Sequence, residues 1–194
     1  MNQEQRHCWI LAGPNGSGKS TFAARYLPRM CPGISFLNVD TIAAGLSAFN
    51  PSGAAVEAGR IMSARFREHV AAAKVFGFET TLSGRTYEKI LTQMKADGWK
   101  LSLIYLWIPG PEASLKRVAQ RVLEGGHDIS LADIQRRHRR SLRNLLHVYT
   151  PLCDHVMCMD NRYEGGRPIY LKTSKMHLEV FNDLLYERLW SDAE

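Results

Sequence analysis

The apolar positions of this chain follow two alternating patterns. Short runs of apolar and β-branched residues predict five β-strands, at 7–12, 34–39, 75–80, 101–108 and 155–159. Elsewhere, apolar residues recur at helical spacing and predict helices at 19–26, 52–73, 86–96, 111–123, 130–149 and 174–190. Strands that alternate with helices are typical of a parallel sheet covered by helices. The pattern therefore predicts a three-layer α/β fold around a mostly parallel five-stranded sheet, with 168–171 as a candidate edge strand.

Length and composition are those of an ordinary globular protein. The chain has 194 residues, 45% of them hydrophobic and 23% charged, so we expect one domain over 1–194 and exclude collagen-like, low-complexity and disordered proteins. No apolar run approaches the roughly 18 residues that cross a bilayer, no secretory leader is recognised, and the four cysteines form no CxxC pair. We therefore expect a cytoplasmic protein with reduced thiols and no membrane association. Its net charge of +6 indicates an anionic partner.

Residues 13–20 form the most specific motif of the chain. They read GPNGSGKS, match the pattern G-x-x-x-x-G-K-[ST], and lie between a predicted strand and a predicted helix, as this phosphate-binding motif requires. Such loops turn backbone N–H groups toward phosphate oxygens, Lys19 reaches the β- and γ-phosphates, and Ser20 offers a hydroxyl to Mg²⁺. We therefore expect a P-loop that binds ATP and Mg²⁺. The expected nucleotide contacts are Gly13, Pro14, Asn15, Gly16, Ser17, Gly18, Lys19, Ser20 and Thr21.

Two acidic residues, Asp40 and Glu79, come at the ends of predicted strands. In open α/β sheets ligands gather at the carboxyl ends of strands, so both are expected beside the P-loop. A carboxylate there can accept the proton of a substrate hydroxyl or hold Mg²⁺. The alternatives are a cap on a helix that begins near residue 41 for Asp40, and a hydrogen-bonded turn for Glu79. Beside Glu79, we expect Thr81 and Ser83 to contribute hydrogen bonds to a polar substrate.

Residues 111–150 carry eight Lys and Arg side chains against four Asp and Glu. Two glycines and a histidine, at 125–127, separate the two predicted helices, so we expect a mobile helical lid over about 117–140. We expect Arg121 and Arg137 to contact the γ-phosphate, because guanidinium groups stabilise charge on a phosphoryl group during transfer. The other arginines of the second helix fall opposite its apolar stripe, as a solvated face. They are Arg136, Arg139, Arg140 and Arg143.

Six segments together carry a resemblance to a known family. They are the loop at 13–21, then 38–40 (NVD), 78–84 (FETTLSG), 117–127, 136–145 and 160–162 (DNR). Over about residues 7–165 the chain resembles the zeta toxin family of bacterial toxin–antitoxin systems, in its short chromosomal form. Zeta toxins have a P-loop kinase fold, similar to that of adenylate kinases. They phosphorylate the 3′-hydroxyl of the amino sugar in UDP-N-acetylglucosamine, so the resemblance implies a kinase for that nucleotide-sugar or a similar one.

The resemblance also implies roles for individual residues. Asp40 is the implied catalytic base, and an antitoxin protein is the implied partner. The implied contacts are Glu79 and Thr81 with the substrate, Arg121 and Arg137 with the transferred phosphoryl group, and Asn161 and Arg162 with the adenine.

A different class of function stays open at this point. A polynucleotide 5′-hydroxyl kinase or an RNA-binding NTPase would use the arginine-rich helix at 130–149 to hold a phosphate backbone. Aromatic residues are not interleaved among those arginines as a base-stacking platform requires, so we expect a small metabolite rather than nucleic acid. A nucleotide-binding module without phosphoryl transfer would leave Asp40 without a role.

Overall fold

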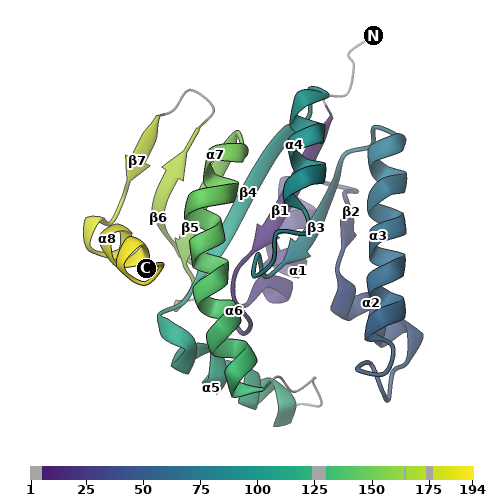
Figure 1. Ribbon diagram of the computed structural model, residues 1–194, viewed down its shortest axis with the longest axis horizontal. Helices are drawn as coiled ribbons and strands as arrows, with labels where there is room; N and C mark the ends of the chain where they lie inside the picture. Colours follow the sequence, from purple (N-terminus) through teal and green to yellow (C-terminus); the bar gives the residue numbers. More distant parts are fainter. Residues whose placement is uncertain (1–5, 124–129, 164, 174–176) are drawn as a thin grey trace.

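A seven-stranded sheet forms the centre of the protein (Figure 1). The computed structural model describes residues 6–123, 130–163, 165–173 and 177–194, without the side chains of 121–123. The strand order is β2–β3–β1–β4–β5–β6–β7; the first five strands of this order are parallel, and β6 and β7 continue the sheet antiparallel. The strands are β1 His7–Ala12, β2 Ser35–Leu37, β3 Phe76–Thr80, β4 Lys100–Trp107, β5 His155–Asp160, β6 Arg167–Lys172 and β7 Leu178–Val180.

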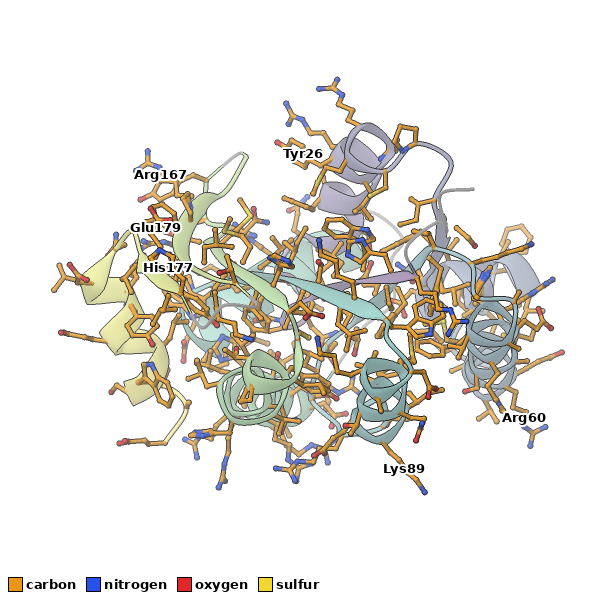
Figure 2. The ribbon with its side chains drawn as sticks, turned by 90° about the horizontal axis from the view of Figure 1, so that it is seen from above. Tyr26, Arg60, Lys89, Arg167, His177 and Glu179 are labelled. Carbon is orange, nitrogen blue, oxygen red and sulfur yellow. The ribbon has the colours of Figure 1, made fainter. Side chains whose placement is uncertain are left out.

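Helices cover both faces of the sheet and complete the three layers that the sequence predicts. Figure 2 shows α1, with Tyr26, on one side of the sheet, and α4, with Lys89, on the other. The face opposite α1 also carries α3 and the continuous segment from α6 through a π-helical turn, η1, to α7. The helical segments are α1 Lys19–Met30, α2 Val39–Leu46, α3 Ala55–Ala71, α4 Glu88–Ala96, α5 Gly110–Leu123, α6 Leu131–Asn144, η1 Leu145–Tyr149, α7 Thr150–Leu152 and α8 Asp183–Ser191.

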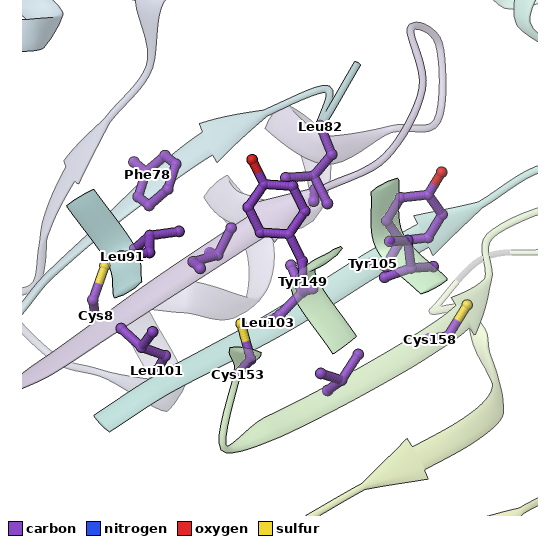
Figure 3. Packing of buried hydrophobic residues seen from close by; sticks show 14 of the residues in the cluster. Cys8, Phe78, Leu82, Leu91, Leu101, Leu103, Tyr105, Tyr149, Cys153 and Cys158 are labelled. Atoms are coloured by element: carbon purple, nitrogen blue, oxygen red, sulfur yellow. The ribbon is translucent and has the colours of Figure 1, made fainter. Parts of the chain in front are cut away.

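The core consists of one apolar cluster on each face of the sheet. Side chains alternate along β1, so Ile10 joins the larger cluster while Leu11 packs with α1 in the smaller one. In the larger cluster, Tyr105 and Tyr149 are fully buried (Figure 3). The central strand β4 reads as an almost continuous apolar run because both of its faces are covered.

The register of the sheet decides where the candidate site lies. Leu11 pairs with Glu79, and Ala12 pairs with Thr80, so β1 and β3 end at the same level. The loop that follows β1 therefore starts beside the C-terminal end of β3, where Glu79 is the penultimate residue. This is the carboxyl edge of the parallel strands, where ligands of open α/β folds bind.

The C-terminal part of the chain differs from the sequence prediction. One helix was expected over 174–190, but Leu178–Val180 forms strand β7 and α8 begins only at Asp183. β7 pairs with β6, and the side chain of Asn182 caps α8 by accepting a hydrogen bond from the backbone N–H of Leu185. In the described part of the chain the sheet accordingly has seven strands rather than five, with the expected edge strand at 168–171 lying within β6.

All four cysteines are free thiols, as expected, and three of them are buried. Among the described residues, no helix combines the length and the apolar character needed to span a bilayer.

Candidate active site

The P-loop connects β1 to α1 and is shaped by glycines. Gly13, Gly16 and Gly18 have positive φ angles of 146°, 74° and 86°, which side-chain-bearing residues rarely adopt. A Cβ atom on Gly13 would lie 2.4 Å from the carbonyl oxygen of Leu106 on β4. The loop therefore needs glycine both for its backbone angles and for its packing against the central strand. The loop leads directly into the N-terminus of α1, where the backbone N–H groups have no hydrogen-bond partners within the helix and favour anions.

Lys19, Ser20 and Glu79 meet at the start of α1. The hydroxyl of Ser20 donates to Oε2 of Glu79 over 3.0 Å, and Nζ of Lys19 lies 3.8 Å from Oε1 of the same carboxylate. Nζ of Lys19 also donates to the carbonyl oxygen of Pro14 at 3.0 Å. The Lys19 side chain, which is 7% exposed, is thus folded back over the P-loop, where its ammonium group can meet phosphate oxygens.

Burial raises the pKa of Glu79 above its usual range. The charge of Lys19 and the hydrogen bonds from Ser20 and Asn38 act in the opposite direction and only partly offset the loss of solvation. The site therefore holds a desolvated acid beside a hydroxyl and an ammonium group, and a cation brought near it would favour the ionised carboxylate.

A carboxylate and a hydroxyl in contact form a donor set that suits Mg²⁺, which prefers oxygen ligands. Glu79 is the penultimate residue of β3, the strand next to β1, and Ser20 is the hydroxyl residue of the P-loop motif. The residues present therefore fit the Mg²⁺ expected with ATP. Among the described residues, no group of three or more His, Cys, Asp or Glu side chains forms a separate metal site.

Asp40 is exposed in the first turn of α2, and the capping role belongs to its neighbour Asn38. Oδ1 of Asn38 accepts hydrogen bonds from the backbone N–H groups of Asp40 and Thr41, while its Nδ2 donates to Glu79 over 2.7 Å. The carboxylate of Asp40 is therefore not needed to cap the helix. Sequence reasoning assigned Asn38 no role of its own; an Asn at the end of a predicted strand was the available signal.

One cleft of about 1170 Å³ brings most of the predicted site residues together. Lys19, Asp40 and Glu79 line it, as do Thr81 and, from α6, Arg137. The remaining predicted residues that line it are Asn15, Gly16, Gly18, Ser20, Thr21, Asn161 and Arg162. Residues from five separate parts of the fold thus face one space, at the carboxyl edge of the sheet.

Other predicted residues lie at the border of this cleft or outside the described part. The hydroxyl of Ser83 is not among the lining groups and is hydrogen-bonded to that of Thr81 at 2.8 Å. Arg121 lies on α5 without a described side chain, and the expected hinge at 125–127 is outside the described residues. On α6 the structure separates the arginines: Arg137 is half-buried and lines the cleft, whereas four others are exposed. These are Arg136, Arg139, Arg140 and Arg143.

The wall opposite Asp40 contains the segment that follows β5. Asn161 donates from Nδ2 to the carbonyl oxygen of Ser17 at 2.7 Å, so its side chain reaches the P-loop. The guanidinium group of Arg162 pairs with the buried carboxylate of Asp160 and lies over the rings of Trp107 and Tyr163. Trp107 is fully buried, so the cleft is lined here by the ring of Tyr163 and the guanidinium group of Arg162, two planar groups that suit stacking on a base.

A family model described as an AAA domain matches residues 8–146. This range includes the P-loop, Asp40, Glu79 and Arg137. The chain belongs to this AAA domain family. An uncharacterized protein of Haemophilus influenzae is 34% identical over 128 residues, which are 65% of this chain and 88% of the relative.

Solved structures share the fold of this AAA domain. A chain of the crystal structure of AvrRxo1-ORF1:-ORF2 with ATP matches with a TM-score of 0.73 and 18% identity, over 98% of this chain and 65% of that chain. The protein thus spans less than two thirds of the AvrRxo1 chain. A chain of the PezAT chromosomal toxin–antitoxin system of Streptococcus pneumoniae matches with a TM-score of 0.66 and 16% identity, over 96% and 79% of the two chains. A chain of the Pnkp1/Rnl/Hen1 RNA repair complex matches with a TM-score of 0.55 and 21% identity, over 72% of this chain and 45% of that chain.

These similarities agree with the sequence prediction. The AAA domain has the three-layer P-loop fold expected from the strand pattern, and this fold is shared with a chain of the PezAT toxin–antitoxin system.

Proposed function

We propose that the protein transfers the γ-phosphoryl group of ATP to a hydroxyl group of UDP-N-acetylglucosamine or a similar nucleotide-sugar. The observation that carries this proposal is the single cleft that joins the P-loop to Asp40, Glu79 and Arg137. A P-loop alone serves many kinds of NTPase, but a free carboxylate facing the same cleft supplies the general base that transfer to an alcohol requires. The resemblance to zeta toxins supplies the identity of the acceptor.

Each residue has a defined task in this reaction. The P-loop N–H groups and Lys19 hold the phosphates, and Asp40 accepts the proton of the acceptor hydroxyl. The hydroxyl oxygen forms its bond to the γ-phosphorus while the bond to the β–γ bridging oxygen breaks, which leaves ADP. Arg137, and Arg121 from α5, stabilise the charge on the phosphoryl group in transfer. Mg²⁺ beside Ser20 and Glu79 would neutralise charge on the β- and γ-phosphate oxygens when bound.

The test is to incubate the protein with labelled ATP, Mg²⁺ and a set of acceptors that includes UDP-N-acetylglucosamine, and to identify the product by mass spectrometry. We expect a nucleotide-sugar heavier by one phosphoryl group. Asp40→Asn should lower turnover by about 10²- to 10⁴-fold while ATP affinity changes little, because the amide cannot accept a proton. Turnover that is unchanged in Asp40→Asn would remove the general base from the mechanism.

A further part of the proposal concerns a protein partner. PezAT is a toxin–antitoxin system, and by this likeness we propose that an antitoxin protein binds the present chain.

A polynucleotide 5′-hydroxyl kinase is the second candidate function. It is favoured by the exposed arginines of α6 and by the likeness to a chain of an RNA repair complex.

A further inference from the structure

The guanidinium group of Arg117 on α5 contacts the carbonyl oxygens of two different segments. Nη1 donates to the carbonyl oxygen of Gly16 in the P-loop at 3.4 Å. Nη2 donates to that of Asn161 at 3.0 Å and approaches that of Arg162 at 3.5 Å. One side chain therefore joins the P-loop to the segment that follows β5. From the sequence, Arg117 is expected only as the first residue of the helical lid over about 117–140.

Asn161 completes this connection from the other side. Its side-chain Nδ2 donates to the carbonyl oxygen of Ser17 at 2.7 Å, and its backbone N–H donates to that of Trp107 at 2.9 Å, which anchors it to the end of β4. Two consecutive P-loop carbonyl groups, those of Gly16 and Ser17, are thus held by side chains from outside the loop.

Arg117 and Asn161 pack closely against glycines of the P-loop. A Cβ atom on Gly16 would lie 3.2 Å from Cβ of Arg117 and 2.9 Å from the carbonyl oxygen of Ser114. A Cβ atom on Gly18 would lie 2.8 Å from Nδ2 of Asn161. Two of the motif's glycines therefore also allow the close approach of these two side chains.

Holding a carbonyl group also fixes the N–H group of the same peptide unit. A trans peptide is planar, and its C=O and N–H bonds point in opposite directions. The carbonyls of Gly16 and Ser17 point to Arg117 and Asn161, so the N–H groups of Ser17 and Gly18 point away from these two side chains. The N–H of Ser17 donates to the carbonyl oxygen of Pro14 at 3.2 Å, which closes a turn inside the loop. Backbone N–H groups of this loop are the ones that cradle phosphate oxygens.

We propose that Arg117 and Asn161 are positioning residues that hold the P-loop in its phosphate-binding shape before the nucleotide binds. Arg117 fixes the peptide unit whose N–H, on Ser17, closes the turn with Pro14, and Asn161 fixes the peptide unit that presents the N–H of Gly18. They act through the P-loop and not by contact with a phosphate. This inference rests on the proposed binding of ATP by the P-loop, but not on the identity of the acceptor. Binding to a preordered loop avoids the cost of ordering it, so the effect falls on nucleotide affinity.

The main experiment compares Arg117→Lys, Arg117→Ala and Asn161→Ala with the wild-type protein. The probes are ATP and inorganic tripolyphosphate, which has no base, and binding is measured by calorimetry. Lysine keeps the charge but lacks the planar set of donors that reaches two segments at once. We expect the affinity of each variant, Arg117→Lys included, for both probes to be lower by about 10-fold or more, because hydrogen bonds that hold the P-loop are lost. Lys116→Ala is the matched control, because this exposed neighbour on α5 should bind like the wild type.

Two results would overturn the proposal. If Arg117→Lys binds tripolyphosphate as the wild type does, Arg117 acts through its charge alone. If ATP affinity falls but tripolyphosphate affinity does not, Arg117 and Asn161 act on the base and not on the P-loop.

A second measurement separates this proposal from the proposed function. In the nucleotide-free protein, hydrogen–deuterium exchange of peptides that contain residues 13–20 should be faster in Arg117→Lys than in Lys116→Ala, since the loop is then less tightly held. Unchanged exchange would contradict the positioning role even in a protein that bound no nucleotide. With acceptor present, we expect the KM for ATP to rise while kcat at saturating ATP is retained, which a general loss of folded protein would not produce.

Discussion

Glu79 illustrates how a single residue can serve binding at the expense of stability. Burial raises the pKa of its carboxyl group in the folded protein above that in the unfolded chain. The group therefore contributes its full stability below the pKa of the unfolded chain, and this contribution is lost as the pH rises through the folded-state pKa. At neutral pH the buried, ionised carboxylate therefore lowers the free energy of unfolding.

From this sign we predict that Glu79→Gln raises the Tm of the nucleotide-free protein at neutral pH, because the amide removes the buried charge and still accepts hydrogen bonds. The gain over the wild type should shrink as the pH falls through the folded-state pKa and the wild-type carboxyl becomes protonated. Thermal unfolding followed by circular dichroism between pH 4 and pH 8 is the measurement. A variant that is less stable than the wild type at pH 8 would show that the contacts with Lys19 and Ser20 outweigh burial.

Gly13 and Gly98 form a matched pair for a second prediction at this scale. Both have positive φ, but a Cβ on Gly13 would meet the backbone of β4 at 2.4 Å, whereas the space around Gly98 is open. Gly98→Ala should lower the free energy of unfolding by about 1 kcal/mol, from backbone strain alone. Gly13→Ala should lower it by about 3 kcal/mol or more, because a central strand cannot move aside. Equal losses in urea titrations would contradict the packing argument.

Helix α6 presents arginines of two kinds, so its two faces can be tested separately. Arg137→Ala removes the arginine that lines the cleft, and turnover should fall by about 10²- to 10³-fold if this charge stabilises the transferred phosphoryl group. Replacing the exposed Arg139, Arg140 and Arg143 together with Gln should leave metabolite phosphorylation within about three-fold, because exposed charges are screened by salt.

If the protein acts on nucleic acid, we expect the opposite result, with the exposed arginines of α6 important for substrate binding. If three exposed arginines contact single-stranded phosphates, their loss should weaken oligonucleotide binding and reduce the slope of log K against log salt by about 2. Oligonucleotide binding at several salt concentrations, with 5′-phosphorylated product measured in parallel, decides between the two substrate classes. Tight oligonucleotide binding that is lost only in the triple variant would contradict the proposal that the substrate is a small metabolite.

At the scale of elements, sequence periodicity predicted the parallel strands and the main helices well, because buried strands and amphipathic helices have distinct apolar spacings. It also placed Asp40 and Glu79 at one edge, because parallel strands end together. It failed at the C-terminus, where three residues of β7 are too few to show a period and their pairing with β6 decides the structure. The role of Arg117 was equally hidden, since it depends on where α5 crosses the P-loop.

The whole molecule should respond to nucleotide through mass action. A ligand that binds only the folded protein stabilises it by about 2.7 kcal/mol at a concentration of 100 times Kd, which is a Tm shift of about 5 to 10 °C for a protein of this size. We predict such a shift with ATP and Mg²⁺, and none in Lys19→Ala. Each shift is measured relative to the same protein without nucleotide, because Lys19→Ala also removes the ammonium group near Glu79 and can change the Tm by itself. An undiminished shift in this variant would contradict the P-loop assignment.

The two edges of the sheet matter for how the protein behaves when many copies are present. The edge strands, β2 and β7, are each only three residues long. An edge strand exposes unpaired backbone groups onto which a strand of another molecule can add, and short edges offer few of them. The long strands, including the apolar β4, lie inside the sheet. Crowding during rapid synthesis should therefore not lead folded copies to assemble edge to edge into fibrils.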